Sequence, residues 1–426
     1  MQRTKCRVII IAIFAIMTAT LILASSAAAS SYKIIHAFRW SKGPTGNLAR
    51  DAAGNLYGTA SFGGGSGRFC RTGCGSVWKL KPNANGTWTV SILHYFKGPP
   101  DGAWPSGVIF DPAGNLYGTT GGGGSGCGGP GCGTVFKLAP NPDGTWAETV
   151  LYSFTGGADG GSPDGGLIFD TAGNLYGTTA GGGIVTGLCS SGCGTVFKLA
   201  PNSDGTWTES VLYAFSGYLD GGGPTAGLIF DAASNLYGTT EGGGSSGWGT
   251  VFMLAPNPDG TWTESVLYSF TGGVGGSGGA PSSGVVFDAA GNLYGTTSQS
   301  GAYRCGVVFK LAPNSDGTWT ESVLHSFTCG ADGDSPEAGL IFDAVGNLYG
   351  TTLRGGSSTE CFSVGCGVVF KLIPDPDGTW KECVVHSFLG YGRGPRAPLL
   401  LDPAGHLYGT SWGQQPPYGL VFEITP

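Results

Sequence analysis

The chain has 426 residues, of which 82 are Gly and 25 are Pro, and only 12% are charged. So much Gly and Pro is typical of low-complexity chains, but hydrophobic residues at 40% and aromatic residues at 12% supply enough apolar surface for a folded core. The composition therefore excludes a disordered chain, and the net charge of −7 excludes a nucleic-acid-binding protein that depends on bulk positive charge.

The N-terminal residues 1–29 have the pattern of a secretory signal peptide. Basic residues near the start precede an apolar run over residues 8–23, and three small residues end at Ala29. This pattern predicts export with cleavage after Ala29, and a retained N-terminal anchor is the alternative. No later segment approaches the ~18 apolar residues of a membrane-spanning helix. The sequence therefore predicts an exported protein, extracellular or periplasmic, without a membrane span after cleavage.

One motif, D-x-x-G-N-L-Y-G-T, recurs seven times at intervals of 55–61 residues. In the fourth copy Ser234 replaces the Gly, and in the seventh copy His406 replaces the Asn. Such regular repetition indicates that residues 30–426 form one domain built from seven equivalent units. The motif begins at Asp51, Asp111, Asp170, Asp231, Asp288, Asp343 and Asp402.

Each unit predicts four short strands, named a to d in chain order. In the third unit they are residues 166–170, 174–178, 195–199 and 207–215, which are rich in β-branched and aromatic residues. The D-x-x-G-N sequence between a and b and the D-G-T-W sequence between c and d are typical of tight turns. No segment has a helical period. Four antiparallel strands repeated seven times predict an all-β, seven-bladed β-propeller.

The two ends of the chain complement each other. Residues 32–38 match a strand d, and residues 419–426 match a strand c that no strand d follows. Pairing of the N-terminal strand with the last blade would complete that blade and remove two sheet edges. The sequence therefore predicts a closed ring rather than a linear solenoid.

The repeats resemble those of the GloVer tandem-repeat family of bacterial surface or secreted proteins. The motifs D-x-x-G-N-L-Y-G-T-T, G-T-V-F-K-L-A-P and D-G-T-W-T-E-S-V-L-Y-S-F carry the resemblance, which covers residues 32–426. The family implies an exported, repeat-built protein and brings no established activity. Its members often carry a C-terminal sorting anchor, whereas this chain ends at Pro426 within a predicted strand, so no anchoring is expected. The strand-b motif is also similar, more weakly, to NHL and lactonase-type propellers, which supports the fold.

We expect a binding site on the face that carries the b–c and d–a loops. These loops vary between copies while the a–b and c–d turns hardly change, and variable loops on a rigid scaffold commonly host function. Acidic residues of the d–a loops point toward the centre of the ring, where they would attract cations or hydroxyl-rich ligands. The alternative is that they only shape turns. These residues are Asp101, Asp159, Asp164, Asp220, Asp332, Asp334 and Glu337.

Aromatic residues outside the repeat pattern lie in the same loops. Flat rings beside Asp and Asn suit a ligand with planar, polar faces such as a sugar, and Trp104 and Trp248 are the expected contacts. Anchoring of the loops onto the blades is the alternative. The loop aromatics are Trp40, Trp104, Tyr218, Tyr391, Trp248, Tyr303, Trp412 and Tyr418.

The histidines leave no candidate for a catalytic base. Four of the five occupy one position of strand d that is Tyr in other copies, which is typical of packing, and His406 replaces the turn Asn. Ser-His-Asp and Cys-His catalysis therefore lack a base, and a metal site built on His has no support. Carboxylate oxygens alone can hold calcium, so calcium is the one cofactor that stays open.

Eleven cysteines follow the signal sequence, and ten of them form pairs on the b–c/d–a face. In an exported protein the pairs predict disulfide bonds, with zinc sites as the alternative. Cys383 is left unpaired in strand d, where other copies have Ser or Thr, which is typical of a small buried side chain. The predicted pairs are Cys70 with Cys74, Cys127 with Cys132, Cys189 with Cys193, Cys361 with Cys366, and Cys305 with Cys329.

Together these patterns predict a secreted, monomeric, non-catalytic propeller that binds an extracellular carbohydrate or a cell-surface protein. The loop aromatics favour binding, and the absence of a spare histidine disfavours catalysis. A calcium-dependent lyase, lactonase or hydrolase that uses the acidic rim is the alternative. A structural surface protein whose repeats merely tile is the third hypothesis.

Overall fold

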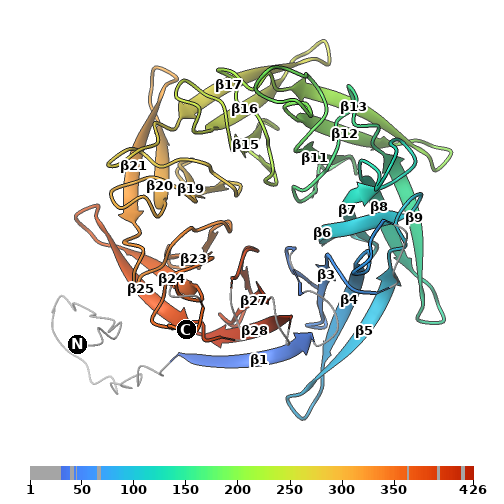
Figure 1. The fold of residues 1–426 in the computed structure, drawn as a ribbon, viewed down its shortest axis with the longest axis horizontal. Helices are drawn as coiled ribbons and strands as arrows, with labels where there is room; N and C mark the ends of the chain where they lie inside the picture. Colours follow the sequence, from blue (N-terminus) through green and yellow to red (C-terminus); the bar gives the residue numbers. More distant parts are fainter. Residues whose placement is uncertain are drawn as a thin grey trace, which may run out of the picture.

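The computed structural model describes residues 30–38, 43–44, 46–64, 69–361, 364–390, 394–413 and 418–426. Over this part of the chain 28 strands form seven four-stranded antiparallel sheets, and no helix occurs. The sheets stand around a central axis like the blades of a propeller (Figure 1). The predicted all-β, seven-bladed fold is confirmed. Residues 1–29, Trp40 and Tyr391, on which predictions were made, lie outside the described residues.

The four strands of each blade run from the axis outward in the order a, b, c, d (Figure 1). The a strands are β2 (Ala49–Arg50), β6 (Gly102–Phe110), β10 (Ile168–Phe169), β14 (Ile229–Phe230), β18 (Val286–Phe287), β22 (Ile341–Phe342) and β26 (Leu400–Leu401). The b strands are β3 (Leu56–Ala60), β7 (Leu116–Gly123), β11 (Leu175–Thr179), β15 (Leu236–Thr240), β19 (Leu293–Thr297), β23 (Leu348–Thr352) and β27 (Leu407–Trp412). The c strands are β4 (Ser76–Pro82), β8 (Thr134–Pro140), β12 (Thr195–Pro201), β16 (Thr250–Pro256), β20 (Val307–Pro313), β24 (Val368–Pro374) and β28 (Gly419–Thr425). The d strands are β5 (Trp88–Tyr95), β9 (Trp146–Ser153), β13 (Trp207–Ala214), β17 (Trp262–Ser269), β21 (Trp319–Ser326), β25 (Trp380–Ser387) and β1 (Ser31–Phe38).

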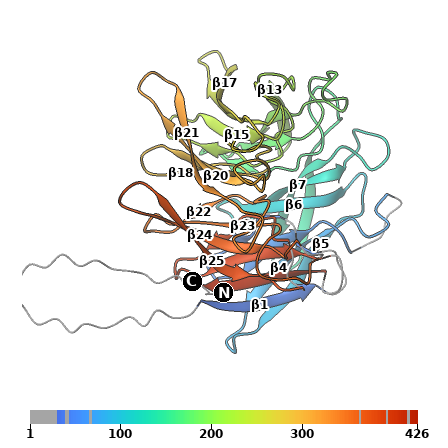
Figure 2. The same cartoon turned by 60° about the vertical axis from the view of Figure 1, so that its left-hand side comes forward.

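The N-terminal strand closes the ring as predicted. β1 pairs antiparallel with β28, from Ser31 opposite Thr425 to Phe38 opposite Gly419. The seventh blade is therefore β26, β27, β28 and β1. In both views β1 lies between the sixth and the first blade (Figures 1 and 2). Because β28 pairs with β27 on one side and with β1 on the other, closure leaves this strand without an unpaired edge.

The a–b turn is built on the first Asp of the repeated motif. In the third blade, Asp170 Oδ1 accepts the backbone N–H of Asn174 at 2.9 Å, and its Oδ2 accepts the Asn174 amide at 2.6 Å and the Tyr176 hydroxyl at 3.0 Å. Burial opposes ionisation of Asp170, but these hydrogen bonds outweigh it and hold its pKa below the usual value. In the seventh blade His406 Nδ1 takes the place of the Asn amide, 3.1 Å from Asp402 Oδ2.

The core lies between blades and is built from aromatic rings. Phe197 of β12 packs edge-to-face on Phe154 at the end of the preceding blade's strand d, with ring centroids 5.1 Å apart. The ring of Phe197 also lies over Gly177 of β11, where an added Cβ would come within 2.7 Å of it. The same Phe–Phe contact recurs from blade to blade, and at the ring closure Phe38 contacts Trp78 at 5.5 Å. The Gly of L-Y-G-T is therefore required by packing rather than by the turn.

A second contact between blades orients the d–a loops. Gly223 has a left-handed backbone and donates its N–H to the Cys193 carbonyl of the preceding blade at 2.8 Å. The next residue, Pro224, packs on Gly194 at the start of β12, where an added Cβ would lie 2.6 Å from the proline ring. All seven junctions have this hydrogen bond and this Gly–Pro contact. These two contacts hold each d–a loop to the preceding blade, just before the chain reaches the residues around the axis of the ring.

The five predicted cysteine pairs are joined by disulfide bonds. The prediction for Cys383 is wrong, because this residue of β25 is also disulfide-bonded and only partly buried. Strand d is the outer strand of its blade, so a sulfur there is accessible from outside the blade. The Ser and Thr of the other copies could not indicate this.

Candidate functional site

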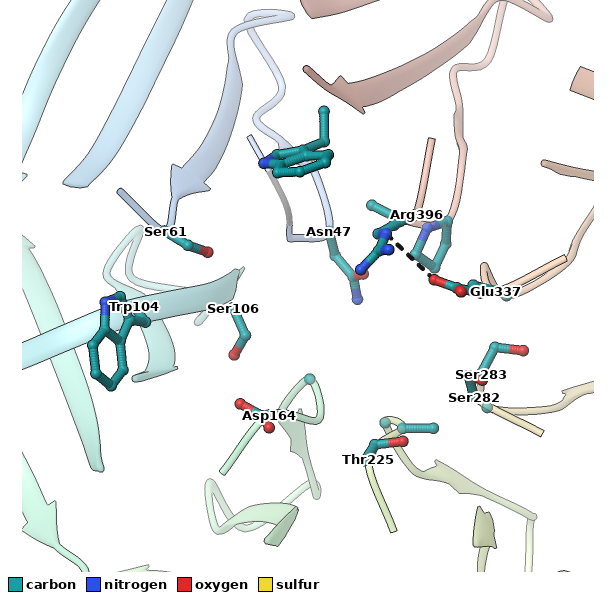
Figure 3. Close-up of a pocket in the computed structure, with 18 of the residues that line it drawn as sticks. Asn47, Ser61, Trp104, Ser106, Asp164, Thr225, Ser282, Ser283, Glu337 and Arg396 are labelled. Carbon is teal, nitrogen blue, oxygen red and sulfur yellow. Dashed lines mark ion pairs between the residues drawn. The ribbon is translucent and has the colours of Figure 1, made fainter. Parts of the chain in front are cut away.

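A cavity of about 550 Å³ opens at the axis of the ring on the face that carries the b–c and d–a loops. It is lined by residues from every blade (Figure 3). In blades three to seven one lining residue occupies the same place in the repeat, six positions before the first Asp of the motif. The residues at this place are Asp164, Thr225, Ser282, Glu337 and Arg396.

Arg396 is held between an acid and an aromatic ring. Its Nε lies 3.4 Å from Glu337 Oε2 of the neighbouring blade (Figure 3), and its guanidinium lies 6.0 Å from the centroid of the Trp412 ring. The Glu337 side chain is 27% exposed and the Arg396 side chain 52% exposed, so water screens the ion pair. Both remain accessible to a ligand in the cavity.

One further carboxylate, Asp164, lines the cavity, and Glu241 lies beside the lining residue Thr225. Asp164 faces the water of the cavity but lies deep among the loops around it, and this burial, together with the negative charge of Glu241, raises its pKa to about 6. Glu241 accepts a hydrogen bond from the Thr225 hydroxyl at 3.0 Å. Burial raises the pKa of Glu241 as well, and the charge of Glu337 adds to the effect. The cavity therefore combines Asp164, a carboxyl group that holds its proton unusually well, with the ion pair of Glu337 and Arg396.

Trp104 lies on the rim of the cavity and has an unusual backbone (Figure 3). Its φ of 61° is in the left-handed region, and its N–H donates to the Cys74 carbonyl at 2.9 Å. Ala280 of the fifth blade has the same conformation at the same place, with φ of 52°. The left-handed turn therefore belongs to the blade junction, and only the indole is particular to Trp104.

The other residues predicted for the site lie elsewhere. Asp159 accepts hydrogen bonds from Thr155 N–H at 2.8 Å and from the Tyr152 hydroxyl at 3.1 Å, and it thereby closes its own loop. Asp220 and Asp332 have the same role in their loops. Asp334 accepts the Ser335 hydroxyl at 2.8 Å. None of these four carboxylates lines the cavity.

Trp248 also lies outside the cavity and takes the place of a disulfide bond. It occupies the position before the strand-c glycine that is the second Cys of the pair in neighbouring blades. Its indole packs against Gly272 and Gly279 of the next loop, where added Cβ atoms would come within 2.2 and 2.7 Å of the ring. In the third blade Gly217 lies against the disulfide of Cys189 in the same way. The structure thus brings together Trp104, Asp164 and Glu337 of the predicted set.

The family model of the Gloeobacter/Verrucomicrobia repeat matches residues 22–229, 184–362 and 231–426. The chain belongs to this family. The match confirms the resemblance predicted from the repeated motifs. A comparison with curated proteins found no match.

Solved propellers resemble this member of the Gloeobacter/Verrucomicrobia repeat family in fold. A gluconolactonase from Xanthomonas campestris is 14% identical with a TM-score of 0.41, over 94% of this chain and 92% of that chain. A PQQ-bound aldose sugar dehydrogenase from Streptomyces coelicolor is 12% identical with a TM-score of 0.42, over 93% of this chain and 98% of that chain. These enzymes are lactonase- and dehydrogenase-type propellers, and the likeness is one of fold alone.

Sequence reasoning missed Arg396 as a member of the site and Glu241 beside it, and it placed Trp412 among the loop aromatics without naming it as an expected contact. A signal was present in the repeats. The residue six positions before the first Asp of the motif, and the residue five positions after the Leu of L-Y-G-T, differ from copy to copy although their surroundings repeat. Glu241 and Trp412 both occupy the second of these positions. In a repeat protein, a position at a fixed distance from the repeated motif lies at the same place in every repeat. Where the residue at such a position differs from copy to copy, the varying side chains identify a shared surface.

Among the described residues no helix is long and apolar enough to cross a membrane. The disulfide bonds are consistent with an oxidising compartment outside the cytoplasm.

Proposed function

We propose that this protein is exported and binds a carbohydrate in the axial cavity. The observation that carries the proposal is the arrangement of Arg396 between Trp412 and Glu337, with Trp104 and Asp164 on the same cavity. Aromatic faces pack on the C–H faces of sugar rings, while carboxylates and guanidinium bind hydroxyl groups in the ring plane. This combination suits a polar, planar ligand better than an apolar one.

The size and polarity of the cavity support a small ligand. About 550 Å³ falls within the range of roughly 300–1,000 Å³ typical of small-molecule sites. Hydroxyl groups of Ser106, Thr225 and Ser282 add donors and acceptors, the last two from two further blades. Because Asp164 and Glu337 line the cavity together with one arginine, the cavity disfavours polyanions. We propose that the protein binds its ligand as a monomer, because one ring contains the whole cavity.

Catalysis on the same ligand is the second candidate, and one observation favours it. A carboxyl with a pKa of about 6, as at Asp164, retains part of its proton near neutral pH and can act as a general acid. A lyase, lactonase or hydrolase would place the bond to be cleaved beside Asp164. Calcium held by carboxylates of the d–a loops would assist such a reaction by polarising a carbonyl or hydroxyl oxygen.

Glycan binding is tested by titrating the untagged protein with a panel of oligosaccharides in a calorimeter, with and without calcium. Trp104→Ala and Glu337→Gln are expected to weaken binding at least tenfold. Trp104→Ala keeps a residue that the fold already accepts, because Ala280 has the same backbone conformation. Val345→Ala, in an a–b turn on the opposite face and 79% exposed, is the matched control and should leave binding unchanged.

The same experiment distinguishes the hypotheses. Binding that these variants do not weaken would overturn the assignment to the axial cavity. Product formation that Asp164→Asn abolishes while binding persists would establish the enzyme. No binding of any glycan would overturn the carbohydrate proposal and leave a protein partner or a structural role.

A further inference from the structure

Three potential metal ligands meet on the outer side of the ring, between the first and second blades. His94 belongs to β5, Asp101 to the loop that follows it, and Glu148 to β9 of the next blade. One ligand atom from each lies within 4.8 Å of the other two. Within the ranges that the structure describes, this is the single group of three His, Cys, Asp or Glu residues that comes so close. The group is remote from the axial cavity and plays no part in the proposed function.

Two of the ligand atoms have the separation that a tetrahedral ion requires, and the third lies within 4.8 Å of both. His94 Nε2 lies 3.4 Å from Asp101 Oδ2, and the two side chains are only 17% and 16% exposed. Two ligand atoms at roughly 2.1 Å from a tetrahedral zinc ion lie about 3.4 Å apart. The approach is also longer than a good hydrogen bond.

Two of the three groups lack a hydrogen-bond partner although their atoms are buried. These are Nε2 of His94 and Oε1 of Glu148. The equivalent Oε1 is also without a partner in Glu209, Glu264, Glu321 and Glu382, so the histidine nitrogen is the atom that distinguishes this group. Leaving a buried polar atom without a partner typically costs about 1–3 kcal/mol, so such atoms call for an explanation. A cation between the three side chains would satisfy both orphaned atoms.

The other blade junctions show how the same position is satisfied without an ion. Tyr152 donates its hydroxyl to Asp159 at 3.1 Å, and Tyr213 donates to Asp220 at 3.2 Å. His325 forms a hydrogen bond of 3.3 Å with Asp332. The potential ligand atoms of His325, Asp332 and Glu382 do not all lie within 4.8 Å of one another. Among the residues that the structure describes, the first junction alone has a histidine nitrogen without a partner.

We propose that His94, Asp101 and Glu148 bind a first-row divalent cation of the zinc type that joins the first blade to the second. One imidazole nitrogen and two carboxylate oxygens are a ligand set that zinc accepts, with water at the fourth position. Calcium prefers six to eight oxygen ligands and is disfavoured by the imidazole. Because β5 and β9 belong to different sheets, the bound ion would hold them together much as a disulfide does.

The test uses untagged, EDTA-treated full-length protein and zinc chloride. Zinc should bind with a stoichiometry of one and raise the unfolding temperature, and calcium should do neither. His94→Tyr introduces the residue that the next junction has at Tyr152, so this variant should fold normally and have the unfolding temperature of the metal-free protein. Its zinc affinity should fall by more than about 100-fold, since loss of an outer-shell partner alone typically costs 10–100-fold.

Two further variants make the outcome specific. Glu148→Gln preserves the shape of the side chain and should also abolish the zinc shift, whereas His325→Tyr at the fifth junction is the matched control and should retain it. Absence of zinc binding by the wild-type protein at 100-fold excess would overturn the proposal. So would binding that survives in both His94→Tyr and Glu148→Gln.

Discussion

The residues of the repeated motif are explained by their contacts. The first Asp accepts hydrogen bonds from the Asn and Tyr of the same motif, as Asp170 does from Asn174 and Tyr176. The Gly between them turns the chain through the left-handed region, with φ of 83° at Gly173. Ser234 occupies this place in the fourth blade with φ of 66°, a conformation that L-residues other than Gly adopt at a cost.

Ser234→Gly should therefore stabilise the protein. We expect an increase of about 0.5–1 kcal/mol in the free energy of unfolding, because glycine removes the left-handed penalty and restores the residue of the other copies. Denaturant unfolding of the purified protein measures this difference.

Gly173→Ala is the reciprocal control. No atom lies within 4 Å of an added Cβ at Gly173, so the backbone angle alone should make this change destabilising by about 1 kcal/mol. A destabilised Ser234→Gly variant would show that the serine hydroxyl, rather than the backbone angle, decides the energy of this turn.

At the scale of the strands, the glutamates of strand d lie against the loop of the preceding blade. Burial raises the pKa of four of them to about 7, and for Glu209 and Glu264 the neighbouring loop Asp adds to the effect. The four residues are Glu209, Glu264, Glu321 and Glu382. In each of them Oε1 is buried without a hydrogen-bond partner.

These glutamates should make the protein more stable in mild acid than in base. A carboxyl with an ordinary pKa of 4.5 and a folded pKa of about 7 binds protons more tightly in the folded state. Its contribution is complete below pH 4.5 and is lost as the pH rises through 7. Burial lowers the pKa of His386 to about 4, which opposes the trend only below pH 6.5. Because the glutamates are partly exposed, we expect the midpoint to rise by only about 3 °C between pH 8 and pH 6.

Calorimetry at these pH values tests the effect, and glutamine variants assign it. Glu321→Gln mimics the protonated form, so it should raise the unfolding temperature at pH 8 and reduce the pH dependence. Glu360→Gln, an exposed glutamate of a b–c loop, is the control. A midpoint that falls between pH 8 and pH 6 would contradict the role assigned to strand d.

At the scale of the whole molecule, one equivalent aromatic contact between strand-d and strand-c rings recurs at each of the seven blade junctions. Six connect consecutive blades, such as Phe154 with Phe197, and the contact of Phe38 with Trp78 closes the circle. Tyr32 of β1 adds a stacked contact with His386 of the sixth blade at 3.9 Å. The N-terminal strand therefore contacts both of its neighbouring blades.

A closed ring predicts that the closing contact is as important as an internal one. Phe38→Ala and Phe154→Ala should each cost about 3 kcal/mol, because each empties a buried site between blades. Unfolding of both variants in denaturant provides the comparison. A nearly neutral Phe38→Ala beside a costly Phe154→Ala would show that the first and seventh blades separate readily in solution.

Sequence alone determined the number of blades, the four strands of each, the closing role of residues 32–38 and the cysteine pairs. These features are local, because turn residues and strand patterns act over a few positions and the repeats display each rule seven times. The tertiary structure decided which variable residues meet. Asp164, Glu337 and Arg396 come from three blades and converge only because each blade directs one residue toward the axis. Asp159 and Asp332 are also acidic residues of d–a loops, but their carboxylates accept hydrogen bonds from the backbone of their own loops. A side chain's direction within a loop depends on packing against the preceding blade, which spacing along the chain does not encode.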